Sequence, residues 1–284
     1  MIEEDFLRHL DRMSVLVQKR VSSNFIGERK SLQTGKGNMF KDHRMYTPGD
    51  DFRDIDWKVY GRTDKLHVKK YEEDKSLSTH IILDSSKSMD YKSGDVTKFE
   101  YASMVGLAFA YMAMKKNERF MLSTFADSLD IFTPRRGRRQ FVRVIDYLKE
   151  KQAGGKTNFE QSLLTYLKRI GSRSLIVVVS DFFYDIDEIE RSLKRFKNCE
   201  IILIQVIDEV ESRMNLKGDL RFRDMETSQV IRAFMDAVTK KLYFKKKEEH
   251  NEKLKWIASS LGAKFYTFST ETPIFDSIYN VLRN

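Results

Sequence analysis

Hydrophobic residues fall into two alternating patterns from about residue 77 to the end of the chain. Thr79–Leu83 and Ser174–Ser180 are short, apolar and rich in β-branched residues, which predicts buried strands. Phe99–Met114 is longer and apolar almost all round, which predicts a helix packed against a sheet. Strands that alternate with helices in this way indicate a largely parallel sheet covered on both faces. We therefore predict an α/β fold with a doubly wound, mostly parallel sheet.

The same criteria predict the other elements of this region. In chain order they are strands at Arg119–Phe125 and Leu129–Phe132, helices at Gln140–Lys149, Phe159–Ile170 and Ile186–Phe196, a strand at Ile201–Ile207, a hairpin within Leu216–Val230, a long charged helix that ends at about Ser260, a strand at Ala263–Phe268 and a helix at Ile274–Leu282. With 284 residues, the chain is long enough to bury one large core and to carry a smaller attachment.

The region before residue 77 has a different pattern. Apolar residues at helical spacing predict an amphipathic helix within residues 1–20: Phe6, Leu7, Leu10, Met13 and Val17. Residues 25–76 are polar and charged, with short strand-like pieces such as Leu66–Val68. We expect residues 1–76 to form this helix and an irregular, strand-containing extension, and residues 77–284 to form the α/β domain.

Two of the predicted strands end in carboxylates. Thr79–Leu83 continues into a D-x-S-x-S sequence that begins at Asp84, and Ser174–Ser180 is followed by Asp181. Taken alone, the first sequence is more typical of a helix start, because Asp and Ser cap helix N-termini. Between the two strands, a Gly-Gly-Lys-Thr loop places the hydroxyl of Thr157 just before a helix. If the sheet has the strand order 3-2-1-4-5-6, both strand ends meet at its switch point, where sites form in such sheets.

Five oxygen-bearing side chains would then converge at one place: Asp84, Ser86, Ser88, Thr157 and Asp181. Carboxylates and hydroxyls are hard donors that suit Mg²⁺, Mn²⁺ or Ca²⁺ and are poor ligands for zinc or copper. Three neutral hydroxyls leave positive charge on the metal, so an open position can recruit an acidic side chain of another protein. The set resembles the metal-ion-dependent adhesion site of von Willebrand factor A domains, and magnesium is the metal we expect first.

A second motif lies in the extension, where the sequence from Arg44 to Trp57 reads R-M-Y-T-P-G-D-D-F-R-D-I-D-W, with Gly35-Lys36-Gly37 before it and Arg62 after it. This motif resembles the signature of the MoxR-associated proteins, the domain of unknown function 58 family. The resemblance covers nearly the whole chain. It implies a von Willebrand factor A-like domain and an adaptor or co-chaperone role beside a MoxR-type AAA+ ATPase or its client. Many relatives carry transmembrane helices ahead of the motif, and none is evident here, so peripheral membrane association stays open.

Read from its residues alone, the motif is dense in Arg and Asp, and alternating charges of this kind predict a paired network that pins an irregular segment to the domain. Pro48-Gly49 predicts a turn. We expect Trp57 to anchor the segment in the core. Clustered aspartates can also serve a nuclease, provided that they converge in space.

Composition narrows the partners and the compartment. The formal net charge of +9 is concentrated in Arg135–Arg139 and Lys240–Lys247, without any nucleic-acid-binding motif, so a solvated face or a patch for an acidic partner is favoured. The single cysteine, Cys199, excludes an internal disulfide and suggests a buried structural thiol in a reducing cytoplasm. The chain start lacks a signal-peptide pattern, and no apolar run approaches the ~20 residues of a membrane span.

Enzymatic readings fit less well. The Gly-Lys-Thr at residues 155–157 resembles the end of a P-loop, but Glu150 stands where that loop needs glycine. Asp84 resembles the nucleophile of haloacid-dehalogenase-like phosphatases, but Ser86 stands where they place a second Asp as acid. The five histidines form no metal-binding pair. We predict a non-enzymatic, metal-dependent binding module, with a magnesium-dependent phosphoesterase and a basic nucleic-acid-associated protein as the alternatives.

Overall fold

The computed structural model describes residues 8, 11, 34–35, 39–72, 78–170, 174–196, 199–214, 216, 218–225 and 229–283. The chain divides into two compact units, one of Met1–Lys19 with Leu77–Asn284 and the other of Arg20–Ser76. The helix predicted within residues 1–20 lies outside the described residues, apart from the helical positions Arg8 and Asp11.

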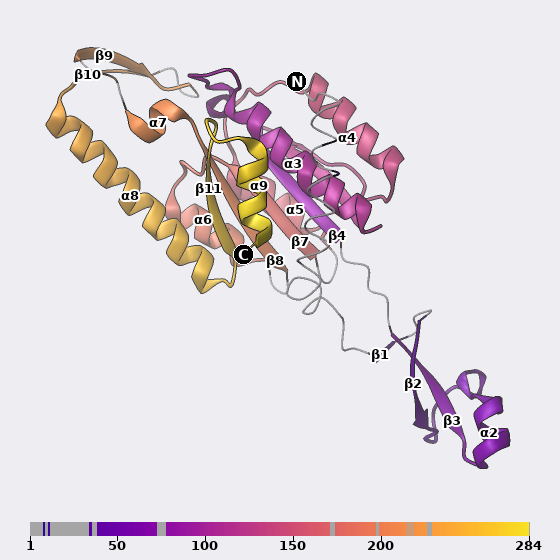
Figure 1. The fold of residues 1–284 in the computed structure, drawn as a ribbon. Helices are drawn as coiled ribbons and strands as arrows, with labels where there is room; N and C mark the ends of the chain where they lie inside the picture. The colour runs from indigo at the N-terminus through magenta and orange to yellow at the C-terminus, as the bar shows by residue number, and fades with distance from the viewer. Residues whose placement is uncertain are drawn as a thin grey trace. The chain divides into compact units, whose positions relative to one another are not determined.

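The larger unit is built on a six-stranded sheet with the order β11-β8-β7-β4-β5-β6 (Figure 1). Its strands are β4 (Ser78–Asp84), β5 (Arg119–Phe125), β6 (Leu129–Asp130), β7 (Ser174–Ser180), β8 (Glu200–Ile207) and β11 (Lys264–Ser269). All neighbours pair in parallel except β6, which pairs antiparallel with β5 at the edge. Counted from β4, this is the predicted order 3-2-1-4-5-6, and the predicted α/β fold class is confirmed.

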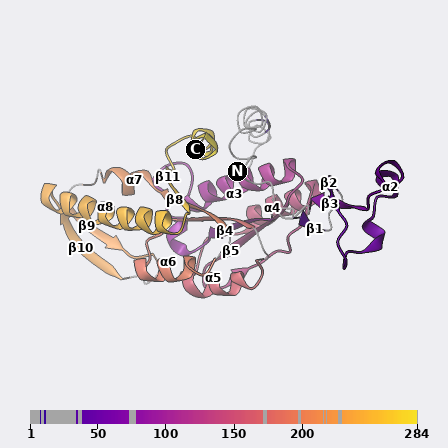
Figure 2. The same ribbon diagram turned by 90° about the horizontal axis from the view of Figure 1, so that it is seen from below.

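Helices cover both faces of this sheet. They are α3 (Lys98–Lys115), α4 (Arg138–Glu150) and α9 (Ile274–Arg283) on one face, and α5 (Phe159–Leu167), α6 (Ile186–Leu193) and α8 (Ala237–Ser260) on the other. Figure 2 shows α3 on one side of the sheet and α5 and α6 on the other. Along β4, Ile81 and Leu83 pack into the first layer and Ile82 into the second, as the two-residue period of a strand requires. Within the described part of the chain, no helix is both long and apolar enough to cross a membrane.

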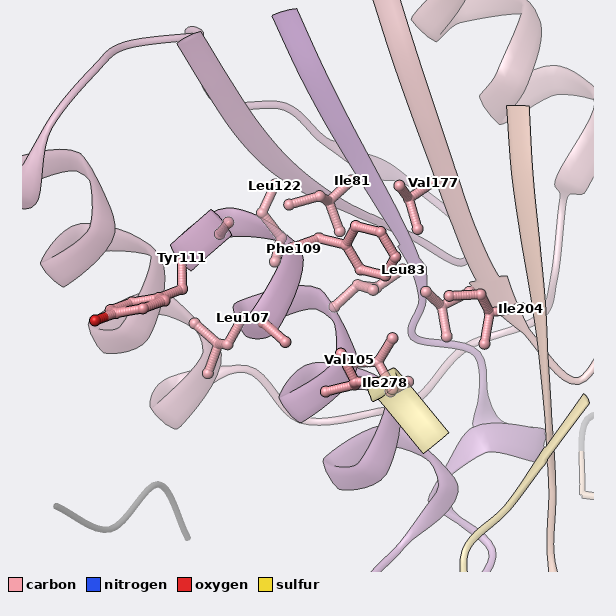
Figure 3. Packing of buried hydrophobic residues seen from close by; sticks show 14 of the residues in the cluster. Ile81, Leu83, Val105, Leu107, Phe109, Tyr111, Leu122, Val177, Ile204 and Ile278 are labelled. Carbon is pink, nitrogen blue, oxygen red and sulfur yellow. The ribbon is translucent and has the colours of Figure 1, made fainter. Parts of the chain in front are cut away.

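The core between the sheet and α3 is closely packed. Val105 and Phe109 of α3 lie against Ile81, Leu83 and Val177 of the sheet (Figure 3). Gly106 allows this approach, because a Cβ atom there would lie 3.2 Å from side-chain carbons of Leu83 and of Leu122 on β5. Burial of a side chain such as Phe109 stabilises the fold by about 1.5–3 kcal/mol. The packing fixes the height at which the first turn of α3 meets the end of β4.

Several elements differ from the sequence prediction. Strand β6 is shorter than the predicted Leu129–Phe132, since it is an edge strand that pairs on one side only. The predicted hairpin is present as β9 (Gly218–Arg223) and β10 (Val230–Met235), but its second strand begins where the prediction ended. A five-residue helix, α7 (Glu209–Arg213), was not predicted, because it is too short to show a helical period; Asp208 and Glu211 form its capping box.

The smaller unit is more regular than the extension we predicted. Its strands β1 (Thr34–Gly35), β2 (Met39–Met45) and β3 (His67–Glu72) form an antiparallel sheet of order β1-β3-β2, and a short 3₁₀ helix, η1 (Phe52–Asp54), and α2 (Trp57–Thr63) connect β2 to β3.

The charged motif pairs within this unit. Arg44 makes a bidentate ion pair with Asp50, and Asp56 accepts a hydrogen bond from His43 Nε2 at 3.0 Å. Asp56 also caps α2 by accepting from the backbone N–H groups of Lys58 and Val59. These bonds hold the connection between β2 and β3 in one conformation.

The prediction that Trp57 anchors the segment in the core is wrong. Its side chain is 62% exposed and meets Tyr60 edge to face, whereas Ile55 is only 4% exposed and lies opposite Val68. The reason is local: Asp56 is the N-cap, so Trp57 is the first helical residue and its side chain leaves the segment on the solvent side.

Replacement of Asp56 tests the role of this network. The hydrogen bond from His43 and the bonds from the α2 backbone lower the pKa of Asp56 to about 2, although burial opposes the shift. A carboxyl group with a lowered pKa contributes stability that is present above the ordinary pKa of 3.8 and is lost as the pH falls through about 2.

We expect Asp56→Ala to speed amide hydrogen exchange in α2 at neutral pH and to leave metal affinity unchanged. Lys58→Ala, an exposed change on the same helix, is the control; a larger loss of metal affinity than of protection would contradict this role.

Candidate metal site

The site begins with two carboxylates that end neighbouring parallel strands. Asp84 is the last residue of β4 and Asp181 directly follows β7, with Leu83 of β4 paired to Val179 of β7. Both side chains are buried, at 0% and 1% exposure. Burial, together with the negative charge of Asp181, raises the pKa of Asp84 to about 6, although three hydrogen bonds oppose the shift. The two carboxylates therefore lie at the same rim of the sheet and close enough to repel each other.

The D-x-S-x-S loop turns back over the end of β4. The backbone N–H of Ser86 donates to Asp84 Oδ1 at 2.8 Å, and a short 3₁₀ helix, η2 (Lys87–Asp90), follows. The Oγ atoms of Ser86 and Ser88 lie 3.0 Å apart. Ser86 is fully buried and Ser88 is half-buried, so their hydroxyls form a short polar row beside Asp84.

The loop that carries Thr157 is fastened to the same place. Gly154 N–H donates to Ser85 O at 2.8 Å, and Lys87 N–H donates to Gly155 O at 3.0 Å. The carboxylate of Asp127, in the turn between β5 and β6, accepts from Lys156 N–H at 2.7 Å. Gly155 has a φ of +83°, and a Cβ atom there would clash with the Asp127 carboxylate, so glycine is required. These bonds hold residues 154–156 against the serine loop, and Thr157, which follows them, is half-buried.

Two hydroxyls that the sequence did not single out complete the surroundings of Asp84. Its Oδ2 atom accepts a hydrogen bond from Ser180 Oγ at 2.7 Å and another from Tyr184 Oη. Burial and the neighbouring Asp84 charge raise the pKa of Tyr184 well above its ordinary value, so the phenol stays a donor. Both oxygens of Asp84 are thus engaged by protein donors.

A buried lysine is the largest departure from the predicted site. Lys98, at 1% exposure, donates from Nζ to Asp181 Oδ2 and to Glu211 Oε1, each at 2.9 Å. Burial alone would lower the pKa of Lys98, but Asp181 and Glu211 outweigh it and raise that pKa above its ordinary value. Lys98 is the first residue of α3, behind a capping box made by Thr97 and Glu100. That T-x-x-E spacing, and a lysine at the start of a mostly apolar helix, are the signals that could have revealed it.

The donors fit a hard cation. In an octahedral magnesium site with bonds of 2.0–2.1 Å, adjacent ligand atoms lie about 2.9–3.0 Å apart. The Oγ atoms of Ser86 and Ser88 share a hydrogen bond at 3.0 Å, a separation that two adjacent ligands of such a site could also have. Asp181 is engaged by an ammonium group, so we expect it to balance charge rather than to ligate directly. Among the described residues, no three His, Cys, Asp or Glu side chains cluster as a metal site.

Cys199 lies at the start of β8, away from these donors. Its side chain is half-buried, and burial raises the pKa of its thiol. A raised thiol pKa favours the inert protonated form over a nucleophile.

The strand order, the helices on both faces and the D-x-S-x-S loop at the carboxyl rim agree with the fold that the resemblance to von Willebrand factor A-like domains implies. Comparison with known families gives the narrower assignment. Residues 42–253 match the family described as "Protein of unknown function DUF58", and the chain belongs to that family.

One relative and two solved structures illustrate the likeness. An uncharacterized protein of Mycobacterium tuberculosis, Rv1480, is 25% identical over 229 residues, which are 79% of this chain and 72% of the relative. The conserved hypothetical protein BatB from Bacteroides thetaiotaomicron is 12% identical, with a TM-score of 0.46, over 73% of this chain and 97% of that chain. The SpRpn10 VWA domain is 16% identical, with a TM-score of 0.42, over 72% of this chain and 94% of that chain.

The raised pKa of Asp84 sets a pH dependence of the metal-free protein. The folded state binds this proton more tightly than the unfolded chain, so the contribution of Asp84 to stability falls as the pH rises from 3.8 to about 6. Urea unfolding in EDTA, measured between pH 4 and pH 7, should therefore show a less negative pH slope for Asp84→Asn than for the wild type. Equal slopes would mean that burial and the charge of Asp181 do not raise the pKa of Asp84.

Lys98 supplies a second test. Lys98→Met removes the cation between two acidic groups and leaves Asp181 buried without its partner. Breaking one side of a buried pair costs about 3–5 kcal/mol. We expect the free energy of unfolding in EDTA to fall by that order, while Lys87→Met, an exposed lysine in the adjoining loop, changes it little. A loss equal to that of the control would show that Lys98 does not balance the site.

Proposed function

We propose that this protein is a non-enzymatic binding module that holds a divalent cation, magnesium in the first instance and manganese or calcium as alternatives, and uses it to bind a protein partner. The observation that supports this most strongly is the meeting of two buried carboxylates and the serine loop at one rim of the sheet. The loop before α5, which carries the third hydroxyl, is hydrogen-bonded to the same loop.

In this proposal the hydroxyls of Ser86, Ser88 and Thr157 ligate the metal directly. Asp84 and Asp181 balance its charge, one or both through water. The bound metal supplies a positive centre with an open coordination position. Because only two carboxylates face it, and Lys98 neutralises part of their charge, that centre retains attraction for a carboxylate from another protein.

The partner that we propose is a MoxR-type AAA+ ATPase or its client, which offers an acidic side chain to the metal. Support comes from the motif at residues 44–57, which lies within the match to the family, and from the likeness of the site to a metal-ion-dependent adhesion site. We place this work in the cytoplasm, with peripheral membrane association as an alternative.

The phosphoesterase alternative is weaker. A nucleophilic Asp84 would need an oxygen directed at the substrate, but its Oδ1 accepts from Ser86 N–H and its Oδ2 from Ser180 and Tyr184. The side chain is also fully buried. Turnover of a generic phosphate ester that disappears in Asp84→Asn would revive this reading.

Metal-dependent capture tests the proposal. The tagged full chain should retain a MoxR-type ATPase of its own organism in Mg²⁺ and lose most of it in EDTA or in Ser86→Ala. At a magnesium concentration of a hundred times Kd, mass action stabilises the fold by about 2.7 kcal/mol, so the melting temperature should rise by several degrees in the wild type only. Lys87→Ala, between the two serines, should behave as the wild type. Capture that ignores EDTA, or a thermal shift that survives Ser86→Ala, contradicts the proposal.

A further inference from the structure

The inner side of α8 is fixed on the larger unit, at whose periphery the helix lies (Figure 1). Leu254 is buried in the core, and His250 Nε2 donates to Phe182 O at 2.7 Å. Near the middle of the helix, Lys247 Nζ donates to Glu211 O at 2.6 Å. These contacts determine which side of α8 faces away from the domain.

The opposite side of α8 carries a row of exposed residues, the outer stripe, at alternating spacings of four and three: Val238, Leu242, Lys245, Glu249, Glu252 and Trp256. With 3.6 residues per turn, this spacing places all of them along one line of the helix. Val238 is 75% exposed, Leu242 53% and Trp256 65%. The part of the chain that the structure describes leaves these three apolar side chains uncovered.

The outer stripe is complementary to itself when a second copy is turned end to end. Each residue has a counterpart at the same distance on the other side of position 247: Val238 with Trp256, Leu242 with Glu252, and Lys245 with Glu249. In an antiparallel pair of α8 helices with a two-fold axis at position 247, these counterparts lie opposite each other and every contact occurs twice. Val238 then packs on the indole of Trp256 at both ends.

Charge favours this antiparallel orientation over a parallel one. In a parallel pair, Lys245 would lie beside Lys245 and Glu249 beside Glu249, whereas the antiparallel pair sets each lysine against a glutamate of the other copy. Exposed ion pairs of this kind contribute little to affinity but penalise the wrong register. The charges therefore set the orientation, and the apolar ends set the affinity.

The rest of the basic run at 240–247 fits the same arrangement. Lys240 and Lys247 are half-buried on the inner side of α8 and stay outside the contact. Lys241 and Lys246 are exposed beside the outer stripe, in the half that meets the glutamates of the other copy. The helix as a whole carries more lysines than glutamates, so its net charge opposes association and the apolar ends must overcome it.

We propose that the outer stripe of α8 binds the outer stripe of a second copy of this chain, forming an antiparallel two-fold dimer. No residue of the outer stripe belongs to the candidate metal site. Each copy therefore keeps its own site, and the dimer does not depend on the proposed function.

Sedimentation equilibrium of the full chain tests this over a concentration series at physiological ionic strength. The average mass should rise with concentration from that of one chain toward twice that mass. Trp256→Asp should raise the dissociation constant about tenfold or more, because it places a charge at a buried apolar contact that occurs twice. Ile231→Asp is the matched control, at 66% exposure on the β9–β10 hairpin, and should stay within about twofold of the wild type.

Exchange of charges tests the register. Lys245→Glu and Glu249→Lys each set like charges against each other at both contacts, so each variant alone should associate more weakly than the wild type. An equimolar mixture of the two variants restores an opposite pair at both contacts and should associate about as the wild type does.

Three results would overturn the proposal. The first is a chain that stays monomeric at every concentration, which would leave the outer stripe to a different partner. The second is a dimer that Trp256→Asp leaves intact or that Ile231→Asp weakens equally, which would move the interface elsewhere. The third is a mixture of Lys245→Glu and Glu249→Lys that associates no better than either variant alone.

Discussion

The structure depends on the neutralisation of two buried carboxylates at one rim of a parallel sheet. Asp84 and Asp181 sit where β4 and β7 end side by side, and both are almost fully removed from water. Buried charges are costly unless they are paired or ligate a metal. The neighbouring groups compensate both charges. Lys98 pairs with Asp181, and Ser86, Ser180 and Tyr184 donate hydrogen bonds to Asp84.

The fold supplies each of these partners from a different element. The capping box at the start of α3 sets where Lys98 emerges, and the packing of Gly106 against the sheet sets the height of that helix. Asp127 holds the loop that carries Thr157, and α7 brings Glu211 to the far side of Lys98. A site that retains repulsion between two carboxylates is less stable than an apolar rim would be. Such local cost is expected where a cation is to be bound.

Local pattern was sufficient for the main architecture. The short β-branched runs predicted the strands of the central sheet, and the strand order placed Asp84 and Asp181 at neighbouring ends, because all parallel strands of such a sheet end at one rim. The order 3-2-1-4-5-6 was a condition of that prediction, and the strand pairing of the structure meets it. The five predicted donors thus came from residue type and strand position alone.

The remaining features depend on tertiary contacts that no local pattern contains. Lys98 and Glu211 are far apart in the sequence, and their meeting depends on how α3 and α7 pack. Ser180 and Tyr184 read as ordinary strand and loop residues until Asp84 is placed between them. The prediction for Trp57 failed because a large aromatic residue suggests burial, whereas the N-cap at Asp56 directs the Trp57 side chain outward.

The central claim is that a hard cation binds at this rim, and anomalous diffraction from crystals of the full chain soaked in Mn²⁺ tests it most directly. The account predicts one strong anomalous peak whose nearest protein atoms are the hydroxyl oxygens of Ser86, Ser88 and Thr157. No peak at the rim, with manganese bound only elsewhere, would contradict it.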